Sequence, residues 1–140
     1  MDEFIYMKDN AMIYIIDDDE IFQFITKKSF ERLERKDDLH FFLNGEDALR
    51  SIKEFISGSK PLPDLIFLDI NMPIMDGWDF LAELQILIDG AEKKPNIYMV
   101  SSSIDDKDLI KSKTYSMIKD YIVKPIKDVN IKEILNELEA

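Results

Sequence analysis

Residues 65–77 read Leu-Ile-Phe-Leu-Asp-Ile-Asn-Met-Pro-Ile-Met-Asp-Gly, and this stretch decides the fold. Four apolar residues in a row are typical of a buried strand. The run ends in Asp69, and the proline and glycine further on indicate a turn. Ligands of open α/β sheets bind outside the carboxyl ends of the strands. A carboxylate directly after a buried strand is therefore a candidate site residue.

Two further apolar runs also end in charged residues. Residues 13–16 lead into the acidic triplet 17–19, and residues 121–123 lead into Lys124 and Pro125. Each pattern alone has an ordinary structural explanation, because an acidic triplet before a helix is often an N-cap and an aspartate before a turn often forms an Asx-turn. The combination of acid, acid and base at three strand ends is specific, since parallel strands bring such ends to one edge.

Apolar runs alternate with helical patterns along the chain. The runs lie near 12–16, 39–43, 65–68, 97–100 and 121–123, and the helices are predicted near 20–35, 45–57, 77–88, 106–115 and 129–138. This alternation indicates βαβ units and a parallel sheet. The first and last helices have one apolar side each, formed by Phe22, Ile25, Phe30 and Leu33 in the first and by Ile131, Ile134, Leu135 and Leu138 in the last.

Composition excludes several classes of function. The chain has 140 residues, no cysteine and a net charge of −11. One domain is expected at this length, without disulfides or thiolate chemistry. The chain lacks the overall excess of basic residues that nucleic-acid binding requires. No apolar run is long enough to span a membrane. The acidic start lacks the basic segment of a signal peptide, so we expect a cytoplasmic protein.

Together these strand-end residues resemble the receiver domain of two-component response regulators, the module that is phosphorylated on aspartate. The resemblance implies an α/β fold, a flavodoxin-like doubly wound five-stranded parallel sheet of order 2-1-3-4-5 with five helices. It covers nearly the whole chain, so we expect 1–140 to be one receiver domain with a folded core of about 10–139. No output domain is expected after the fifth helix.

The resemblance assigns the metal and phosphoryl chemistry residue by residue. Asp69 matches the phosphoacceptor, and Asp17 and Asp18 match the acidic pair that binds Mg²⁺ together with Asp69. Asn71 matches the position that offers its backbone carbonyl to the metal. Mg²⁺ favours such oxygen ligands, and a carboxylate is a competent nucleophile toward phosphorus. Lys124 matches the lysine that neutralises the phosphoryl oxygens, and its bond to Pro125 is cis in the family.

The remaining assignments concern switching and rate. Ser101 matches the hydroxyl residue that binds the phosphoryl group, and Tyr121 matches the aromatic switch residue. Asn71 and Ser103 resemble the variable positions that tune dephosphorylation, which the domain is expected to catalyse itself. The single histidine, His40, lies within the second strand pattern and is interpreted as structural. The phosphodonor histidine is thus expected on a histidine kinase or a histidine phosphotransfer protein.

Output is expected at the face formed by the fourth helix, the fifth strand and the fifth helix. Residues 107–132 contain seven lysines and three aspartates, a local net charge of +4 in an acidic chain. This charge is read either as a mixed, solvated surface or as a face that docks an unknown downstream protein or a second copy in a homodimer.

Departures from the commonest receiver pattern leave alternatives open. Asp19 adds a third acid, which we interpret as a helix cap. Residues 116–120 replace the usual Gly-Ala stretch, and we expect this to alter the fourth helix. A haloacid-dehalogenase-type phosphatase would use Asp17 as its nucleophile, but Ile21 stands where that motif has Thr or Val. A pseudo-receiver typically lacks part of the acid pair or the lysine. A flavodoxin-like electron carrier needs a phosphate loop after the first strand, and none is present.

Overall fold

The computed structural model describes residues 11–103 and 105–139. Residues 1–10, 104 and 140 lie outside the described residues, and these include residues 10 and 104 of the expected core. Within the described residues, five parallel strands form one sheet in the order β2-β1-β3-β4-β5. The strands are β1 (Met12–Ile16), β2 (Asp38–Phe42), β3 (Leu65–Asp69), β4 (Asn96–Ser101) and β5 (Ile118–Val123). The predicted flavodoxin-like sheet and its strand order are confirmed.

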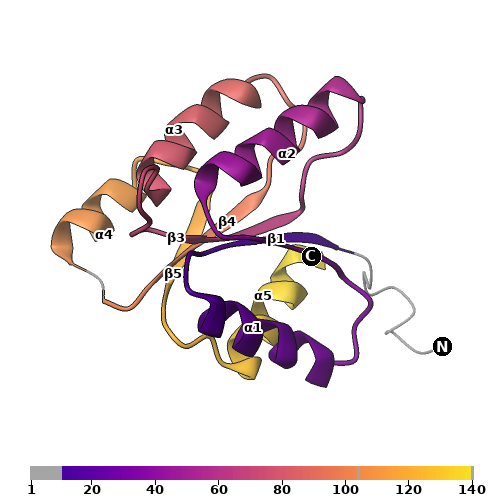
Figure 1. Ribbon diagram of the computed structural model, residues 1–140, viewed down its shortest axis with the longest axis vertical. Coiled ribbons are helices and arrows are strands. Elements are labelled where there is room, and N and C mark those ends of the chain that lie inside the picture. Colours follow the sequence, from indigo (N-terminus) through magenta and orange to yellow (C-terminus); the bar gives the residue numbers. More distant parts are fainter. Residues whose placement is uncertain (1–10, 104, 140) are drawn as a thin grey trace.

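Helices cover both faces of the sheet (Figure 1). They are α1 (Glu20–Arg32), α2 (Gly45–Ser57), α3 (Gly77–Leu87), α4 (Asp106–Ser112) and α5 (Asp128–Glu139). α1 and α5 lie on one face, and α2, α3 and α4 lie on the other. No helix among the described residues is long and apolar enough to cross a membrane.

The core forms two layers because successive strand residues point to opposite faces of the sheet. In β3, Leu65 and Phe67 pack toward α1 and α5, whereas Ile66 and Leu68 pack toward α2 and α3. All five β3 residues are buried. A central parallel strand covered on both faces is expected to read as a continuous apolar run, and residues 65–68 do so.

The register of the central strands positions the acidic residues. The last pair of β1 with β3 joins Ile16 to Leu68. One step further along each strand, the chain reaches Asp17 and Asp69. The two carboxylates therefore leave adjacent strands at the same edge of the sheet, which is the edge where the sequence predicted a site.

Side-chain caps fix where most helices begin. Asp19 accepts hydrogen bonds from the backbone N–H groups of Ile21 and Phe22, and Asp76 forms a capping box with Asp79. Asn44 and Asp105 cap α2 and α4 in the same way. Such caps satisfy backbone donors that have no partner inside the helix. The interpretation of Asp19 as a cap is confirmed.

Some predicted boundaries of helices and strands, and the predicted buried side of α1, differ from the structure. α1 ends at Arg32 instead of 35, because Glu34 adopts a left-handed conformation with φ of 56°. Its buried side consists of Phe22, Thr26, Ser29 and Phe30, so the predicted inward position of Ile25 is wrong. α4 ends at Ser112 instead of 115, and β5 begins at Ile118, three residues before the predicted run.

Candidate phosphoacceptor and metal site

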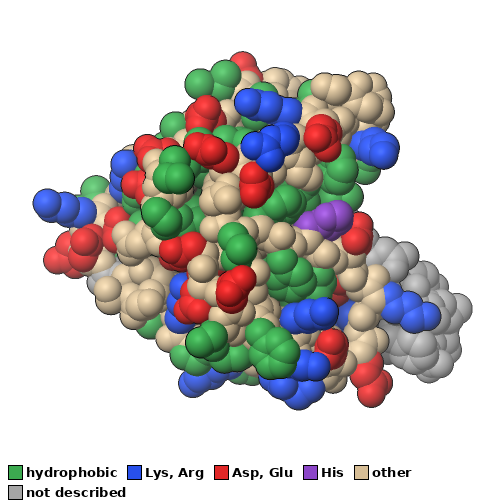
Figure 2. Space-filling view, viewed as in Figure 1, with side chains coloured by type: hydrophobic (Ala, Val, Ile, Leu, Met, Phe, Trp, Pro, Cys, Tyr) green, Lys and Arg blue, Asp and Glu red, His purple; other side chains and the backbone are tan. Residues whose placement is uncertain are grey.

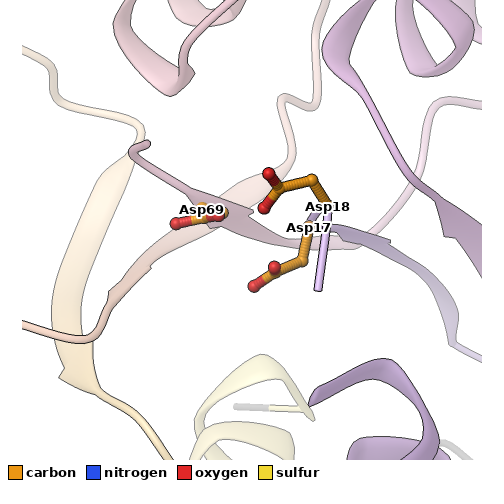
Figure 3. Close-up of side chains that lie close together, drawn as sticks. All are labelled: Asp17, Asp18 and Asp69. Carbon is orange, nitrogen blue, oxygen red and sulfur yellow. The ribbon is translucent and has the colours of Figure 1, made fainter. Parts of the chain in front are cut away.

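Three carboxylates converge at the carboxyl end of the central strands (Figure 3). Asp69 is the last residue of β3, and Asp17 and Asp18 follow β1. One oxygen from each carboxylate lies within 4.8 Å of the others. Asp17 and Asp69 are buried, whereas Asp18 is exposed. The prediction that these three side chains lie together is confirmed.

Asp17 is held on both of its oxygens. The backbone N–H of Asp19 donates to Asp17 Oδ1 over 2.9 Å, and Lys124 Nζ lies 2.8 Å from Asp17 Oδ2. Asp18 differs, because its carboxylate makes no hydrogen bond or ion pair with the part of the chain that the structure describes. Asp17 is therefore the fixed member of the pair, and Asp18 is the member free to bind a ligand.

Lys124 links β5 to the carboxylates. Its backbone N–H donates to the Ser101 carbonyl over 2.8 Å, and the following bond to Pro125 is cis, as predicted. Its ammonium lies 3.8 Å from Asp69 Oδ2 and 4.7 Å from the centre of the Phe22 ring. The aromatic face attracts the cation and covers it from one side. Phe22 was predicted only as a core residue, and no sequence signal indicates its contact with Lys124.

The electrostatics of the cluster are unfavourable without a further cation. Burial and the nearby Asp17 carboxylate raise the pKa of Asp69 from 3.8 to about 7, although Lys124 opposes this shift. Burial also raises the pKa of Asp17, again against Lys124. One ammonium thus does not balance three neighbouring carboxylates. Added positive charge would lower both pKa values and stabilise the ionised forms.

The turn after Asp69 passes very close to the strand end. The Gly77 N–H donates to the Ile70 carbonyl, and a Cβ placed on Gly77 would lie 2.5 Å from the Asp69 carbonyl oxygen. Glycine is needed here for close backbone passage. Asn71 is exposed, and its backbone N–H donates to Asp69 Oδ1 over 3.3 Å. Ile74, in the same turn, is 90% exposed and has a φ of 71°.

Ser101 and Ser103 meet beside the cluster. Ser101 is buried at the end of β4, one residue beyond the pair of Asp69 with Val100. Its hydroxyl donates a hydrogen bond to the Ser103 carbonyl over 2.6 Å, and its hydroxyl oxygen accepts one from the Ser103 N–H over 3.3 Å. The Ser101 hydroxyl therefore stabilises the loop after β4 in this conformation.

Tyr121 lies on β5 beside α4. Its ring packs against the core layer under α2 and α3. Its hydroxyl is buried and has no hydrogen-bond partner among the described residues. Burial, followed by the charges of Asp108 and Asp105, raises the pKa of Tyr121 to about 12. A buried hydroxyl without a partner is costly, so the ring position is sensitive to changes around it.

The donor set fits Mg²⁺. Carboxylate oxygens are hard ligands, and Mg²⁺ usually binds to one or two carboxylates while keeping several waters. Here two buried carboxylates and one exposed carboxylate share a small space, with no cysteine or histidine in the group. The excess of negative charge around Asp69 is the feature that a divalent cation would neutralise.

Comparisons with known proteins agree with this geometry. The chain matches the response regulator receiver domain over residues 13–136 and belongs to this family. The probable methanogenesis regulatory protein FilR2 of Methanothrix harundinacea is 24% identical over 94% of this chain and 83% of its own length. The chemotaxis protein CheY of Thermotoga maritima is 28% identical over 68% of this chain and 70% of its own length.

A solved structure supports the fold. The chain superimposes on a two component response regulator from Cytophaga hutchinsonii with a TM-score of 0.82, at 23% identity, over 92% of this chain and 96% of that one. The family match, and not this superposition, makes the chain a signalling phosphoacceptor of the two-component class. The dehalogenase-type motif has two acids separated by one residue, which would be Asp17 and Asp19. The second acid does not join the site, because Asp19 caps α1 and is not a member of the carboxylate group.

Proposed function

We propose that Asp69 is the residue that accepts the phosphoryl group, in a reaction that requires Mg²⁺ held by Asp17, Asp18, Asp69 and the Asn71 backbone carbonyl. The observation that carries the proposal is the grouping of these carboxylates with Lys124 at the strand ends. When bound, Mg²⁺ neutralises charge on the carboxylates and on the incoming phosphoryl group.

Asp69 is a better nucleophile than Asp17 for a geometric reason. Both oxygens of Asp17 have close partners, whereas within the described residues the contact of Asp69 Oδ2 is the 3.8 Å approach of Lys124 Nζ. A carboxylate oxygen of Asp69 attacks phosphorus, the bond from phosphorus to the donor imidazole nitrogen breaks, and that nitrogen takes a proton from solvent. The product is an acyl phosphate on Asp69 and a free histidine on the donor.

Lys124 and Ser101 then bind the new phosphoryl group. Lys124 Nζ already lies between Asp17 and Asp69, so a small movement brings it onto the phosphoryl oxygens. Ser101 would exchange its bond to the Ser103 carbonyl for one to the phosphoryl group. In the later hydrolysis, water attacks phosphorus, the bond from phosphorus to the acyl oxygen breaks, and inorganic phosphate leaves the regenerated Asp69 carboxylate. Asn71 and Ser103 border this space and would tune that autodephosphorylation rate.

The phosphodonor is a histidine kinase or a histidine phosphotransfer protein in the cytoplasm, and we propose α1 as part of its docking surface. α1 starts directly after the acidic residues. Ile21, Phe24 and Ile25 on this helix are 72%, 61% and 43% exposed. Figure 2 shows apolar side chains over α1 in the lower half of the view, interspersed with charged ones. Phe24→Ala should slow transfer from a phosphohistidine protein and leave labelling by a small acyl phosphate unchanged.

The downstream partner is proposed to dock on the face of α4, β5 and α5. Exposed lysines on this face include Lys107, Lys111, Lys119 and Lys127. Their charge would steer an acidic partner, mainly by raising the association rate at low salt. A second copy of the chain is the other candidate occupant, and sedimentation of the phosphorylated protein distinguishes the two.

Intact-mass measurement tests the proposed reaction. Wild-type protein incubated with acetyl phosphate and Mg²⁺ should gain one phosphoryl group, and chelation of the metal should abolish the gain. Asp69→Asn should remain unlabelled. Asp89→Asn, an exposed change after α3, is the matched control and should label like the wild type. Undiminished labelling of Asp69→Asn would refute the assignment.

A further inference from the structure

Gln23 bridges two strand ends beside the acidic residues. It is half-buried on the first turn of α1. Its side-chain Nε2 donates to the Asp17 carbonyl over 3.0 Å and to the Phe42 carbonyl over 2.7 Å. Because both neighbours are acceptors, only the amide nitrogen of Gln23 can face them. Both amide hydrogens are thereby used.

These two bonds fix one particular peptide unit. Phe42 is the last residue of β2, and its carbonyl also accepts the Asp17 N–H over 3.0 Å. The Asp17 carbonyl belongs to the peptide that joins Asp17 to Asp18. Holding that carbonyl against β2 sets the plane of the peptide, and the plane sets the direction in which the Asp18 side chain leaves the backbone. In Figure 3 this direction is toward Asp69.

The Asp19 N–H bond to Asp17 Oδ1 also restricts the backbone around Asp18, but among the described residues it is Gln23 that contacts the Asp17 carbonyl. Asp17 is fixed through its side chain, and Asp19 is fixed by its cap on α1. The Asp18 carboxylate has no partner in the described part of the chain that would orient it. Its orientation therefore depends on the backbone, and Gln23 is the side chain that holds the Asp17 carbonyl of that backbone.

We propose that Gln23 is a positioning residue for the metal site, which orients Asp18 by holding the Asp17–Asp18 peptide against the end of β2. The inference rests on the proposed Mg²⁺ site and adds a residue that does not contact the metal. Partners that orient metal ligands typically contribute tenfold or more to metal affinity. Loss of the two Gln23 bonds should weaken Mg²⁺ binding while the fold remains, because the sheet register and the α1 cap are unaffected.

Isothermal titration of the full chain with Mg²⁺ tests this role. Gln23→Met keeps the length of the side chain and removes both amide hydrogens, and its dissociation constant for Mg²⁺ should rise about tenfold. Gln23→Asn keeps the amide but is one methylene too short to reach both carbonyls, so it should also bind more weakly. Gln85→Met, an exposed change on α3, is the matched control and should stay within about twofold of the wild type.

The outcomes separate the inference from the proposed function. If the wild type binds Mg²⁺ and both Gln23 variants bind it as tightly, the positioning role is wrong. A lowered melting temperature with an unchanged dissociation constant would also overturn it, because that pattern indicates a purely structural contact. If the wild type itself fails to bind Mg²⁺, or Asp18→Ala binds as well as the wild type, the proposed metal site fails.

Discussion

Asp69 sits in an environment that opposes its own ionisation. Desolvation and the Asp17 charge raise its pKa to about 7, so a large fraction of the metal-free side chain is protonated near neutral pH. A protonated carboxyl group is a poor nucleophile. In the proposed reaction, the same burial would shield an acyl phosphate on Asp69 and would make its formation depend on a cation in addition to Lys124.

A pH dependence of stability follows for the metal-free protein. The folded pKa of Asp69 is raised above the unfolded value of 3.8, so its stabilising contribution is complete below about 4 and is lost as pH rises through about 7. The free energy of unfolding should fall across this window, by up to about 4 kcal/mol from this residue. Urea unfolding with a chelator present should show this fall in the wild type.

Asp69→Asn is the control for that measurement, because its side chain does not titrate. The free energy of unfolding of the wild type minus that of Asp69→Asn should therefore fall between pH 4 and pH 7, by up to about 4 kcal/mol. Profiles that run parallel over the whole range would show that Asp69 titrates normally in the folded protein.

Asp18 and Asp19 are adjacent acids with different roles. Asp18→Ala should weaken Mg²⁺ binding by more than tenfold, because it removes a ligand. Asp19→Ala should leave Mg²⁺ affinity within about twofold but cost about 1 kcal/mol of stability, because it removes the α1 cap. Calorimetric titration and urea unfolding measure the two effects separately. Equal losses of metal affinity would contradict the division of roles.

At the scale of elements, α4 is short and is tied to α3 by Trp78. The Trp78 indole N–H donates to Asp108 Oδ1 over 3.2 Å, and its ring stacks on Tyr115 at 6.0 Å between centroids. The Lys111 ammonium lies 5.1 Å from the centre of the same ring. Residues from α4 and its exit therefore gather around one side chain at the start of α3.

The hydrogen bond from Trp78 to Asp108 predicts that Asp108→Ala has a local effect on α4. Loss of the acceptor leaves the indole N–H unpaired, so stability should fall by about 1–2 kcal/mol and amides of residues 106–115 should exchange faster with deuterium. Asp106→Ala lies in the same first turn and is the matched control, since it shares the helix-dipole contribution. Equal exchange in both variants would show that the Trp78 contact does not hold α4.

The helix ends were the least predictable part of the fold. The early end of α1 depends on the left-handed Glu34, and the end of α4 precedes a stack between Trp78 and Tyr115, which lie far apart in sequence. The inward side of α1 was misplaced because Thr26 and Ser29 are buried while Ile25 is exposed. Apolar periodicity cannot identify small polar residues that pack against a sheet.

At the scale of the whole molecule, the sheet was predictable for a physical reason. A parallel strand that is buried on both faces needs a continuous apolar run, and such runs are visible in the sequence. Strand order came from the family resemblance. The grouping of the three carboxylates was predictable, because the strands that carry them end at one edge of the sheet. The contacts of Gln23 and Phe22 were not predictable, because they depend on how α1 lies over the strand ends.

Phosphorylation should change the conformation of the face formed by α4, β5 and α5, and not only of the metal site. A phosphoryl group that drew Ser101 away from Ser103 would alter the loop after β4, and the buried Tyr121 hydroxyl on the neighbouring strand has no hydrogen-bond partner among the described residues. Amide NMR shifts induced by a beryllofluoride mimic should therefore reach Lys111, Lys119 and Tyr121. Shifts confined to residues around Asp17 and Asp69 would contradict the proposed output face.

Direct mapping of the phosphorylated residue tests the central claim. Borohydride reduces an aspartyl phosphate to homoserine, which peptide mass spectrometry locates in the sequence. After acetyl phosphate and Mg²⁺, we expect homoserine at position 69 alone, and none when the metal is chelated. Homoserine at Asp17 or Asp18, or label at Asp69 that does not depend on the metal, would contradict the account.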